Sequence, residues 1–152
     1  MSTTTPQITP GHVGLNVTDL TRSVDFYRRA LGFEQLAISS EGDRRFAFLG
    51  VDGDLRLTLW QQSSGEFSTG TPGLHHLSFQ VESIEQVRTV EAALKDLGAT
   101  FAHDGVVAHG EGTPSGGIFF TDPDGIRLEV FAPTGAEAEH APDGESPTCG
   151  FF

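Results

Sequence analysis

Hydrophobic and polar residues alternate in two short stretches of the chain that resemble each other. The stretches are HVGLNV (His12 to Val17) and HLSFQV (His76 to Val81). Alternation of this kind predicts β-strands with one buried face. Each predicted strand begins with a histidine, and that histidine lies on the polar face.

A helical pattern follows each of these strands. Asp19 and Ser83 are typical N-cap residues, and apolar residues then recur at helical spacing until Gly32 and Gly98, which typically end a helix. Three more strand-like runs follow each helix. They span residues 33–39, 45–49 and 55–61 in the first half and residues 100–103, 117–121 and 126–131 in the second. The order βαβββ therefore occurs twice.

The two halves also match position by position. His12 corresponds to His76 at an offset of 64 residues (76 − 12), and residues 55–60 correspond to residues 126–131 at an offset of 71 (126 − 55). The extra residues fall mostly in the longer Gly-rich connection of the second half, residues 104–116. This period is too long for a solenoid and predicts a duplicated α+β unit.

The pattern divides the chain into three parts. Residues 1–10 are expected to be flexible, residues 11–132 to form one domain with modules 11–62 and 73–132, and residues 133–152 to form a mostly disordered tail. Only the end of the tail, Cys149 to Phe152, is expected to be held in place. A nucleophilic role for Cys149 is disfavoured, because the tail offers no obvious base.

Charge and composition exclude several kinds of partner. The net charge is −12, from 21 acidic against 9 basic residues, which argues against nucleic acid and anionic membrane surfaces. We find no apolar run near the ~20 residues of a membrane span and no signal-peptide pattern at the start. The single cysteine excludes an internal disulfide, so a cytoplasmic protein is the default expectation.

Three polar residues occupy matched positions on the predicted strands. His12 and His76 begin the first strand of each module, and Glu129 lies in the middle of the last strand, IRLEVF. One strand histidine alone is more often a structural residue than a ligand. A curved sheet would gather all three into a set of two histidines and one carboxylate, which suits Fe(II), Mn(II), Ni(II) or Zn(II).

Other residues are candidates for contact with a substrate or for acid–base chemistry. An apolar pocket with polar contacts is expected from Phe48, Thr58, Trp60, Phe119 and Arg127. Ordinary core packing is an equally good interpretation of the aromatic residues, and an exposed sheet-edge residue is the favoured interpretation of Arg127. His109, in the long loop, is a candidate catalytic acid or base beside Glu129, with a solvated loop histidine as the alternative.

Three segments carry a family resemblance: HVGLNVTDLTRSVDFYRRALGF, HHLSFQV and FTDPDGIRLEVF. They resemble the vicinal oxygen chelate superfamily, which includes glyoxalase I, methylmalonyl-CoA epimerase, extradiol dioxygenases, fosfomycin-resistance transferases and bleomycin-binding proteins. The resemblance implies two βαβββ modules that form a curled, cup-like mixed sheet, often built across two chains of a homodimer. It also implies that His12, His76 and Glu129 bind the metal, with His75 as the substitute if the register differs.

The chain departs from each subfamily it resembles. Glyoxalase I and the epimerase use a fourth acidic or amide ligand where this chain has Thr58. Extradiol dioxygenases and fosfomycin transferases usually have a tyrosine where this chain has Phe119. Bleomycin-type binders lack metal ligands altogether.

The resemblance therefore implies a divalent-metal-dependent enzyme that chelates a small oxygen-bearing substrate. It leaves dioxygenase and lyase or isomerase chemistry open. The alternative is a metal-free, drug-binding resistance protein.

Overall fold

The computed structural model describes residues 4–152 and contains both expected βαβββ modules. The first module consists of β1 (Val13–Val17), α1 (Leu20–Leu31), β2 (Glu34–Ser39), β3 (Phe46–Val51) and β4 (Asp54–Gln61). The second consists of β5 (Leu77–Gln80), α2 (Ile84–Asp96), β6 (Val107–Ala108), β7 (Gly116–Thr121) and β8 (Arg127–Ala132). A short 3-10 helix, η1 (Thr148–Gly150), lies near the end of the chain.

Each module forms one four-stranded mixed sheet, and the two sheets have the same topology. The strand orders are β1-β4-β3-β2 and β5-β8-β7-β6, and the first and last strands of each module pair in parallel. Val13 pairs with Leu57 in the first sheet, and Leu77 pairs with Leu128 in the second. Leu77 is 64 positions after Val13 (77 − 13), and Leu128 is 71 positions after Leu57 (128 − 57). These are the two offsets expected from the sequence, so the α+β duplication and its register are confirmed.

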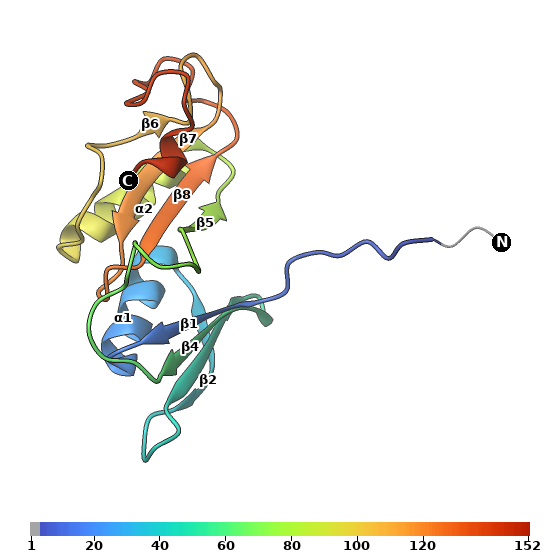
Figure 1. The fold of residues 1–152 in the computed structure, drawn as a ribbon, viewed down its shortest axis with the longest axis vertical. Helices are drawn as coiled ribbons and strands as arrows, with labels where there is room; N and C mark the ends of the chain where they lie inside the picture. Colours follow the sequence, from blue (N-terminus) through green and yellow to red (C-terminus); the bar gives the residue numbers. More distant parts are fainter. Residues whose placement is uncertain (1–3) are drawn as a thin grey trace.

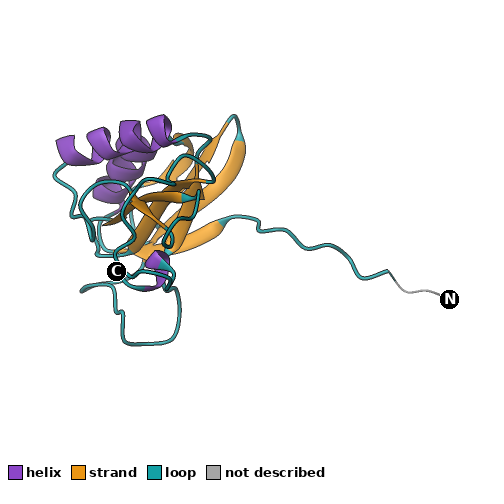
Figure 2. Cartoon of the chain, turned by 90° about the horizontal axis from the view of Figure 1, so that it is seen from above, coloured by secondary structure: helices purple, strands orange, loops and turns teal. Residues whose placement is uncertain are grey.

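The two helices begin and end at the residues that the sequence indicates. The Asp19 side chain accepts a hydrogen bond from the Arg22 N–H, and Ser83 does the same for Gln86. Gly32 ends α1 with φ of 72°, a left-handed conformation that glycine adopts without steric cost. Both helices lie on one side of the strands (Figure 2). No helix in residues 4–152 is both long and apolar enough to cross a membrane.

One hydrophobic core joins the two modules. It combines residues buried beneath α1, such as Leu57 and Leu59, with residues buried beneath α2, such as Leu128 and Val130. Figure 1 shows the modules stacked along the long axis of the molecule, with residues 4–12 leaving the domain as an extended arm. Residues 4–12 of this arm have no secondary structure and are exposed.

The Asp122–Gly125 turn connects the modules through buried polar contacts. The Asp124 carboxylate accepts hydrogen bonds from the Thr18 hydroxyl and from Arg22, at 2.9 Å for the latter. The Tyr27 hydroxyl donates to Asp122 at 2.8 Å. Burial raises the pKa of Asp122, while the Tyr27 hydrogen bond opposes the rise. Burial, and then the charge of Asp122, raise the pKa of Tyr27 well above its usual value.

The fourth strand of the second sheet differs from the expectation. Residues 100–103 were expected to form a strand, but the structure has only an isolated bridge between Phe101 and Phe120. The strand that completes the sheet is β6, inside the expected loop. Its partner is Gly116, where a Cβ atom would lie 2.5 Å from the Val107 carbonyl oxygen. Only glycine permits this close approach of the two backbones.

Residues 133–152 differ from the expected disordered tail, because the structure packs them against the second module. Ala136 and Ala141 are buried, and the Ala108 N–H donates to the His140 carbonyl at 2.9 Å. The Glu111 N–H donates to the Gly144 carbonyl at 2.9 Å. Small residues allow this polar segment to lie close to β6, and the backbone hydrogen bonds fix it there.

Candidate metal centre

Glu129 lies at the middle of β8 and is buried, with 3% of its surface exposed. It pairs across the sheet with Phe119 on β7 and Ser78 on β5. A buried carboxylate is costly unless its oxygens are paired. Here, each of its two oxygens faces a different imidazole, so Glu129 is the centre of a polar cluster.

His76 faces one oxygen of this carboxylate. Its Nε2 lies 3.3 Å from Glu129 Oε1, and its Nδ1 lies 2.8 Å from the Nδ1 atom of His75. The His76 side chain is 20% exposed, so solvent reaches the ring. The sequence register, which places His76 rather than His75 on the Glu129 side of the sheet, agrees with this geometry.

His109 faces the other oxygen. Its Nε2 lies 2.5 Å from Glu129 Oε2, and its Nδ1 lies 2.8 Å from the Ser115 hydroxyl. The ring packs beside Phe131, with centroids 5.2 Å apart. Both ring nitrogens of His109 thus have partners that fix its orientation. The long loop brings this histidine into the cluster, as the acid–base hypothesis requires.

Cys149 is the member of the cluster that the sequence did not indicate. Donor atoms of Cys149, His76 and Glu129 all lie within 4.8 Å of one another. Burial raises the pKa of the Cys149 thiol, and the nearby Glu129 carboxylate raises it further. A single cysteine in a polar, Gly- and Pro-rich segment carries no periodic signal, so only the three-dimensional fold reveals its position.

Within one chain, His12 does not join this cluster. It is exposed and lies just before β1, at the base of the N-terminal arm. Among residues 4–152, the donor atoms that lie close enough to share a metal ion are those of His76, Glu129 and Cys149, and His12 is not one of them.

Three of the expected substrate contacts are also in the first module. The Trp60 indole N–H donates to the Thr58 hydroxyl at 2.9 Å, and the Phe48 and Trp60 rings are 6.0 Å apart.

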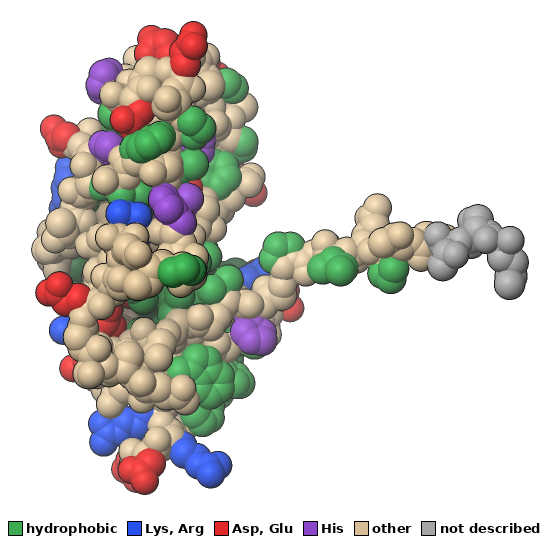
Figure 3. Space-filling model, viewed as in Figure 1, with side chains coloured by type: hydrophobic (Ala, Val, Ile, Leu, Met, Phe, Trp, Pro, Cys, Tyr) green, Lys and Arg blue, Asp and Glu red, His purple; other side chains and the backbone are tan. Residues whose placement is uncertain are grey.

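The other two expected substrate contacts lie in the second module, near Glu129. The Phe119 ring is 5.3 Å from the ring of Phe152, and the Arg127 guanidinium carbon is 5.5 Å from that same ring. Figure 3 shows histidine and hydrophobic side chains together on the surface that the second module forms. The candidate residues therefore form two groups, one on each sheet.

The second-module group fits a divalent metal ion. Bonds of about 2.1 Å in a tetrahedral arrangement place donor atoms about 3.4 Å apart. The His76 Nε2 and Glu129 Oε1 atoms are 3.3 Å apart. Imidazole, carboxylate and thiolate are all established ligands of Zn(II), Co(II) and Fe(II).

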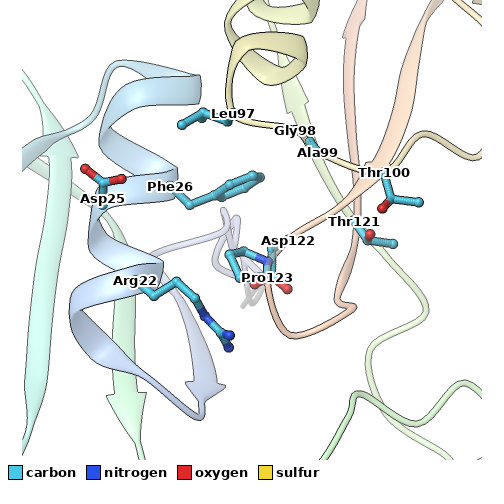
Figure 4. Close-up of a pocket in the computed structure, with 10 residues that line it drawn as sticks. All are labelled: Arg22, Asp25, Phe26, Leu97, Gly98, Ala99, Thr100, Thr121, Asp122 and Pro123. Atoms are coloured by element: carbon cyan, nitrogen blue, oxygen red, sulfur yellow. The ribbon is translucent and has the colours of Figure 1, made fainter.

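A hollow of about 340 Å³ lies elsewhere, between α1 and the turn at Asp122. Figure 4 shows that Arg22 and Phe26 of α1 line it together with Asp122 and Pro123. None of the candidate metal or substrate residues lines this hollow. Cys149 lies beside Glu129 instead, and the Phe152 ring packs against His76 and Phe119.

Comparison with known proteins gives a family match over most of the chain. Residues 9–130 match the family model of the Glyoxalase/Bleomycin resistance protein/Dioxygenase superfamily. Two curated relatives are enzymes. The chain is 29% identical over 138 residues to a trivalent organoarsenical cleaving enzyme of Bacillus sp. (strain MD1), and 26% identical over 125 residues to a catechol-2,3-dioxygenase of Bacillus subtilis. These matches cover 91% and 80% of this chain, and 80% and 40% of the respective relatives.

Solved structures give the same fold. A glyoxylase/bleomycin resistance protein/dioxygenase domain from Frankia sp. EAN1pec has a TM-score of 0.72 at 29% identity, covering 84% of this chain and 99% of that one. The fosfomycin resistance protein FosX of Listeria monocytogenes, complexed with Mn(II) and a sulfate ion, has a TM-score of 0.61 at 22% identity, covering 86% and 96%. Proteins of this fold thus include one solved with a divalent metal.

Proposed function

The chain belongs to the Glyoxalase/Bleomycin resistance protein/Dioxygenase superfamily, and on this premise we propose that it is a divalent-metal-dependent enzyme acting on a small oxygen-bearing molecule. The observation that carries the proposal is the pair of His76 Nε2 and Glu129 Oε1 at 3.3 Å. Their separation matches the donor spacing of one metal ion, and Glu129 is buried where an unpaired carboxylate would be costly.

We assign each residue a role in this centre. His76 and Glu129 hold the metal, and His12 of a second copy of the chain supplies the third ligand, as in the set expected from sequence. The Nε2 atom of His109 contacts the second oxygen of Glu129, and it is the atom at which His109 donates or accepts a proton. A bound divalent ion supplies Lewis-acid stabilisation of a substrate oxygen.

The substrate is expected to contact residues of both modules. Phe119 and Arg127 lie beside the centre in the second module, where the apolar ring excludes water and the guanidinium offers hydrogen bonds to an anionic group. Phe48, Thr58 and Trp60 would reach the same substrate from the first module of a second copy. This arrangement fits a small, partly apolar molecule that binds through two adjacent oxygens.

The reaction is of the dioxygenase or the lyase/isomerase class. The named activities of the two curated relatives motivate both the catechol and the arsenical assays. We would reconstitute the protein without oxygen with Fe(II), Mn(II), Ni(II), Co(II) or Zn(II) in turn. Each form is then assayed on catechols with oxygen, on trivalent organoarsenicals, and on methylglyoxal or epoxides with thiols.

Glu129→Gln tests the centre directly, because it removes the charged ligand without changing the size of the side chain. Loss of a residue that merely contacts a ligand costs about 10- to 100-fold in metal affinity, so loss of this ligand should cost at least about 100-fold and abolish turnover. Glu91→Gln is the matched control, since Glu91 is a buried glutamate on α2 that belongs to no metal cluster in residues 4–152. Full metal content and full activity in Glu129→Gln would contradict the proposal.

A metal-free binding protein is the second candidate function. The aromatic rings of Phe46, Phe48 and Trp60 favour it, since they form a half-buried apolar cluster with centroids 5.3 to 6.0 Å apart. Such a cluster could hold a flat drug-like molecule by stacking. Elemental analysis separates the two functions. Metal well below one equivalent, not restored by any of the five ions, supports the binding protein.

A further inference from the structure

The segment after β8 returns to the candidate metal centre, although the sequence gives it no obvious role. Cys149 is 20 positions beyond Glu129 in the chain (149 − 129). Its Sγ atom nevertheless lies within 4.8 Å of donor atoms of both His76 and Glu129. A thiol, an imidazole and a carboxylate are all ligand types that Zn(II) and Co(II) accept, so this convergence is compatible with one metal ion.

Thr148 holds the thiol in this place. It is fully buried, its hydroxyl donates to the Ala108 carbonyl at 2.7 Å, and its N–H donates to the His109 carbonyl at 2.9 Å. Both acceptors belong to β6 or the residue directly after it. The residue before Cys149 is therefore fixed to the same strand that positions His109 beside Glu129.

Phe152 completes the cover on the other side of Cys149. Its ring centroid is 5.5 Å from that of His76 and 5.3 Å from that of Phe119, and the Arg127 guanidinium carbon lies 5.5 Å from it. These contacts place an aromatic ring over the imidazole ligand and over two residues assigned to substrate contact. The segment thus occupies space that the proposed function gives to a substrate.

We propose that Cys149 is a metal ligand and that residues 148–152 form an in-chain cap, which closes the Glu129 centre with a thiolate. This inference rests on the proposed metal centre and adds a ligand and a means of control to it. The thiolate fills a coordination position that a substrate oxygen would otherwise take, beside the three ligands already assigned. It also biases the centre toward Zn(II) and Co(II) over Mn(II), because sulfur ligands favour softer ions.

Cobalt spectroscopy on the 152-residue chain tests the inference without an activity assay. Wild-type protein loaded with Co(II) is expected to show a sulfur-to-cobalt charge-transfer band in the near ultraviolet, with one thiolate per metal. The band can come only from Cys149, the single cysteine of the chain. Cys149→Ser should lose the band. It should also bind Co(II) at least about 10-fold more weakly, because loss of a residue that only contacts a metal ligand already costs about 10-fold or more in affinity. Its Mn(II) affinity should change less.

Two further variants separate the possible outcomes. Phe152→Ala removes the cover but keeps the thiol, so the band should remain. Glu129→Gln should weaken Co(II) binding and the band together. A band that survives Glu129→Gln at full strength overturns the inference, because the thiol would then bind metal elsewhere.

Failure of the inference and failure of the proposed function give different results. If Co(II) binds in a manner that depends on Glu129 but shows no thiolate band, Cys149 is not a ligand and the proposed enzyme function stands. If wild-type protein binds no Co(II), the proposal of a metal centre is wrong, and the proposal of a capping ligand is wrong as well. Circular dichroism of each variant confirms that it is folded.

Discussion

At the scale of single residues, Glu129 shows how a position gains its chemistry from its neighbours. The alternation of β8 alone would make it an ordinary solvated glutamate on an open face. The structure buries it and gives each oxygen one imidazole, His76 on one side and His109 on the other. Two partners from separate elements offset the cost of burying the charge, and they fix the orientation of the carboxylate.

His109 is predicted to tune the metal affinity without binding metal itself. It lies 2.5 Å from the Glu129 oxygen that faces away from His76. His109→Ala should therefore lower metal affinity about 10- to 100-fold, the usual cost of losing a partner of a metal ligand. Ser115→Ala, which removes only the contact to His109 Nδ1, should cost less. Competition titration against a chelating dye measures both, and an unchanged affinity in His109→Ala would contradict the assigned role.

Asp122 is predicted to make the stability of the protein depend on pH. Burial raises its pKa above the ordinary value of 3.8. The folded protein therefore holds this proton more tightly than the unfolded chain does. The contribution of Asp122 to the free energy of unfolding should be largest below pH 3.8 and should fall as the pH rises through the raised folded pKa, with no further change above it.

Urea unfolding at a series of pH values tests this prediction. Asp122→Asn removes the titrating group. Its free energy of unfolding should therefore fall less than that of wild type as the pH rises from 3.8 through the raised pKa of Asp122. The amide keeps an oxygen that can accept from the Asp124 and Ile126 N–H groups, which hold the turn at 2.9 Å each. Parallel curves for the two proteins would show that Asp122 does not titrate differently on folding.

At the scale of elements, the βαβββ repeat was predictable because its signals are local. Asp19, Gly32 and Ser83 each fix a helix end through contacts within a few residues. Strand β6 was not predictable, because its two residues depend on the close backbone approach at Gly116. The packed tail was not predictable either. Its anchor joins Thr148 to Ala108, 40 positions apart, and no local pattern encodes such a contact.

Thr148 is predicted to control access to Cys149. Thr148→Val keeps the shape of the side chain but leaves the Ala108 carbonyl without its donor, at a cost of about 1–3 kcal/mol for an unsatisfied buried group. The tail should then detach more often, and iodoacetamide should modify Cys149 faster than in wild type. Thr89→Val is the control, because Thr89 bonds only to its own helix at Glu85. Equal modification rates in all three proteins would show that Thr148 does not hold the tail.

At the scale of the whole molecule, the candidate residues are divided between the two sheets of one chain. His12, Phe48 and Trp60 belong to the first module, whereas His76, Phe119 and Glu129 belong to the second. The sequence matches the positions of these residues on equivalent strands. It does not show whether the two modules that form one site belong to the same chain or to two chains. One chain leaves His12 exposed and the aromatic cluster of its sheet half-covered, and both features would be explained by a second copy.

A homodimer is therefore predicted, with each centre built from His12 of one chain and from His76 and Glu129 of the other. Light scattering should give about 32.4 kDa, twice the 16.2 kDa of the chain. Mixing two inactive variants tests the shared site itself. His12→Ala and Glu129→Gln each destroy every centre in their own dimers. When subunits exchange freely, half of the dimers contain one chain of each kind, and each of these has one intact centre. The mixture should thus regain about a quarter of the wild-type metal sites and turnover. A centre built within a single chain would regain none, and the variants would stay inactive at every mixing ratio.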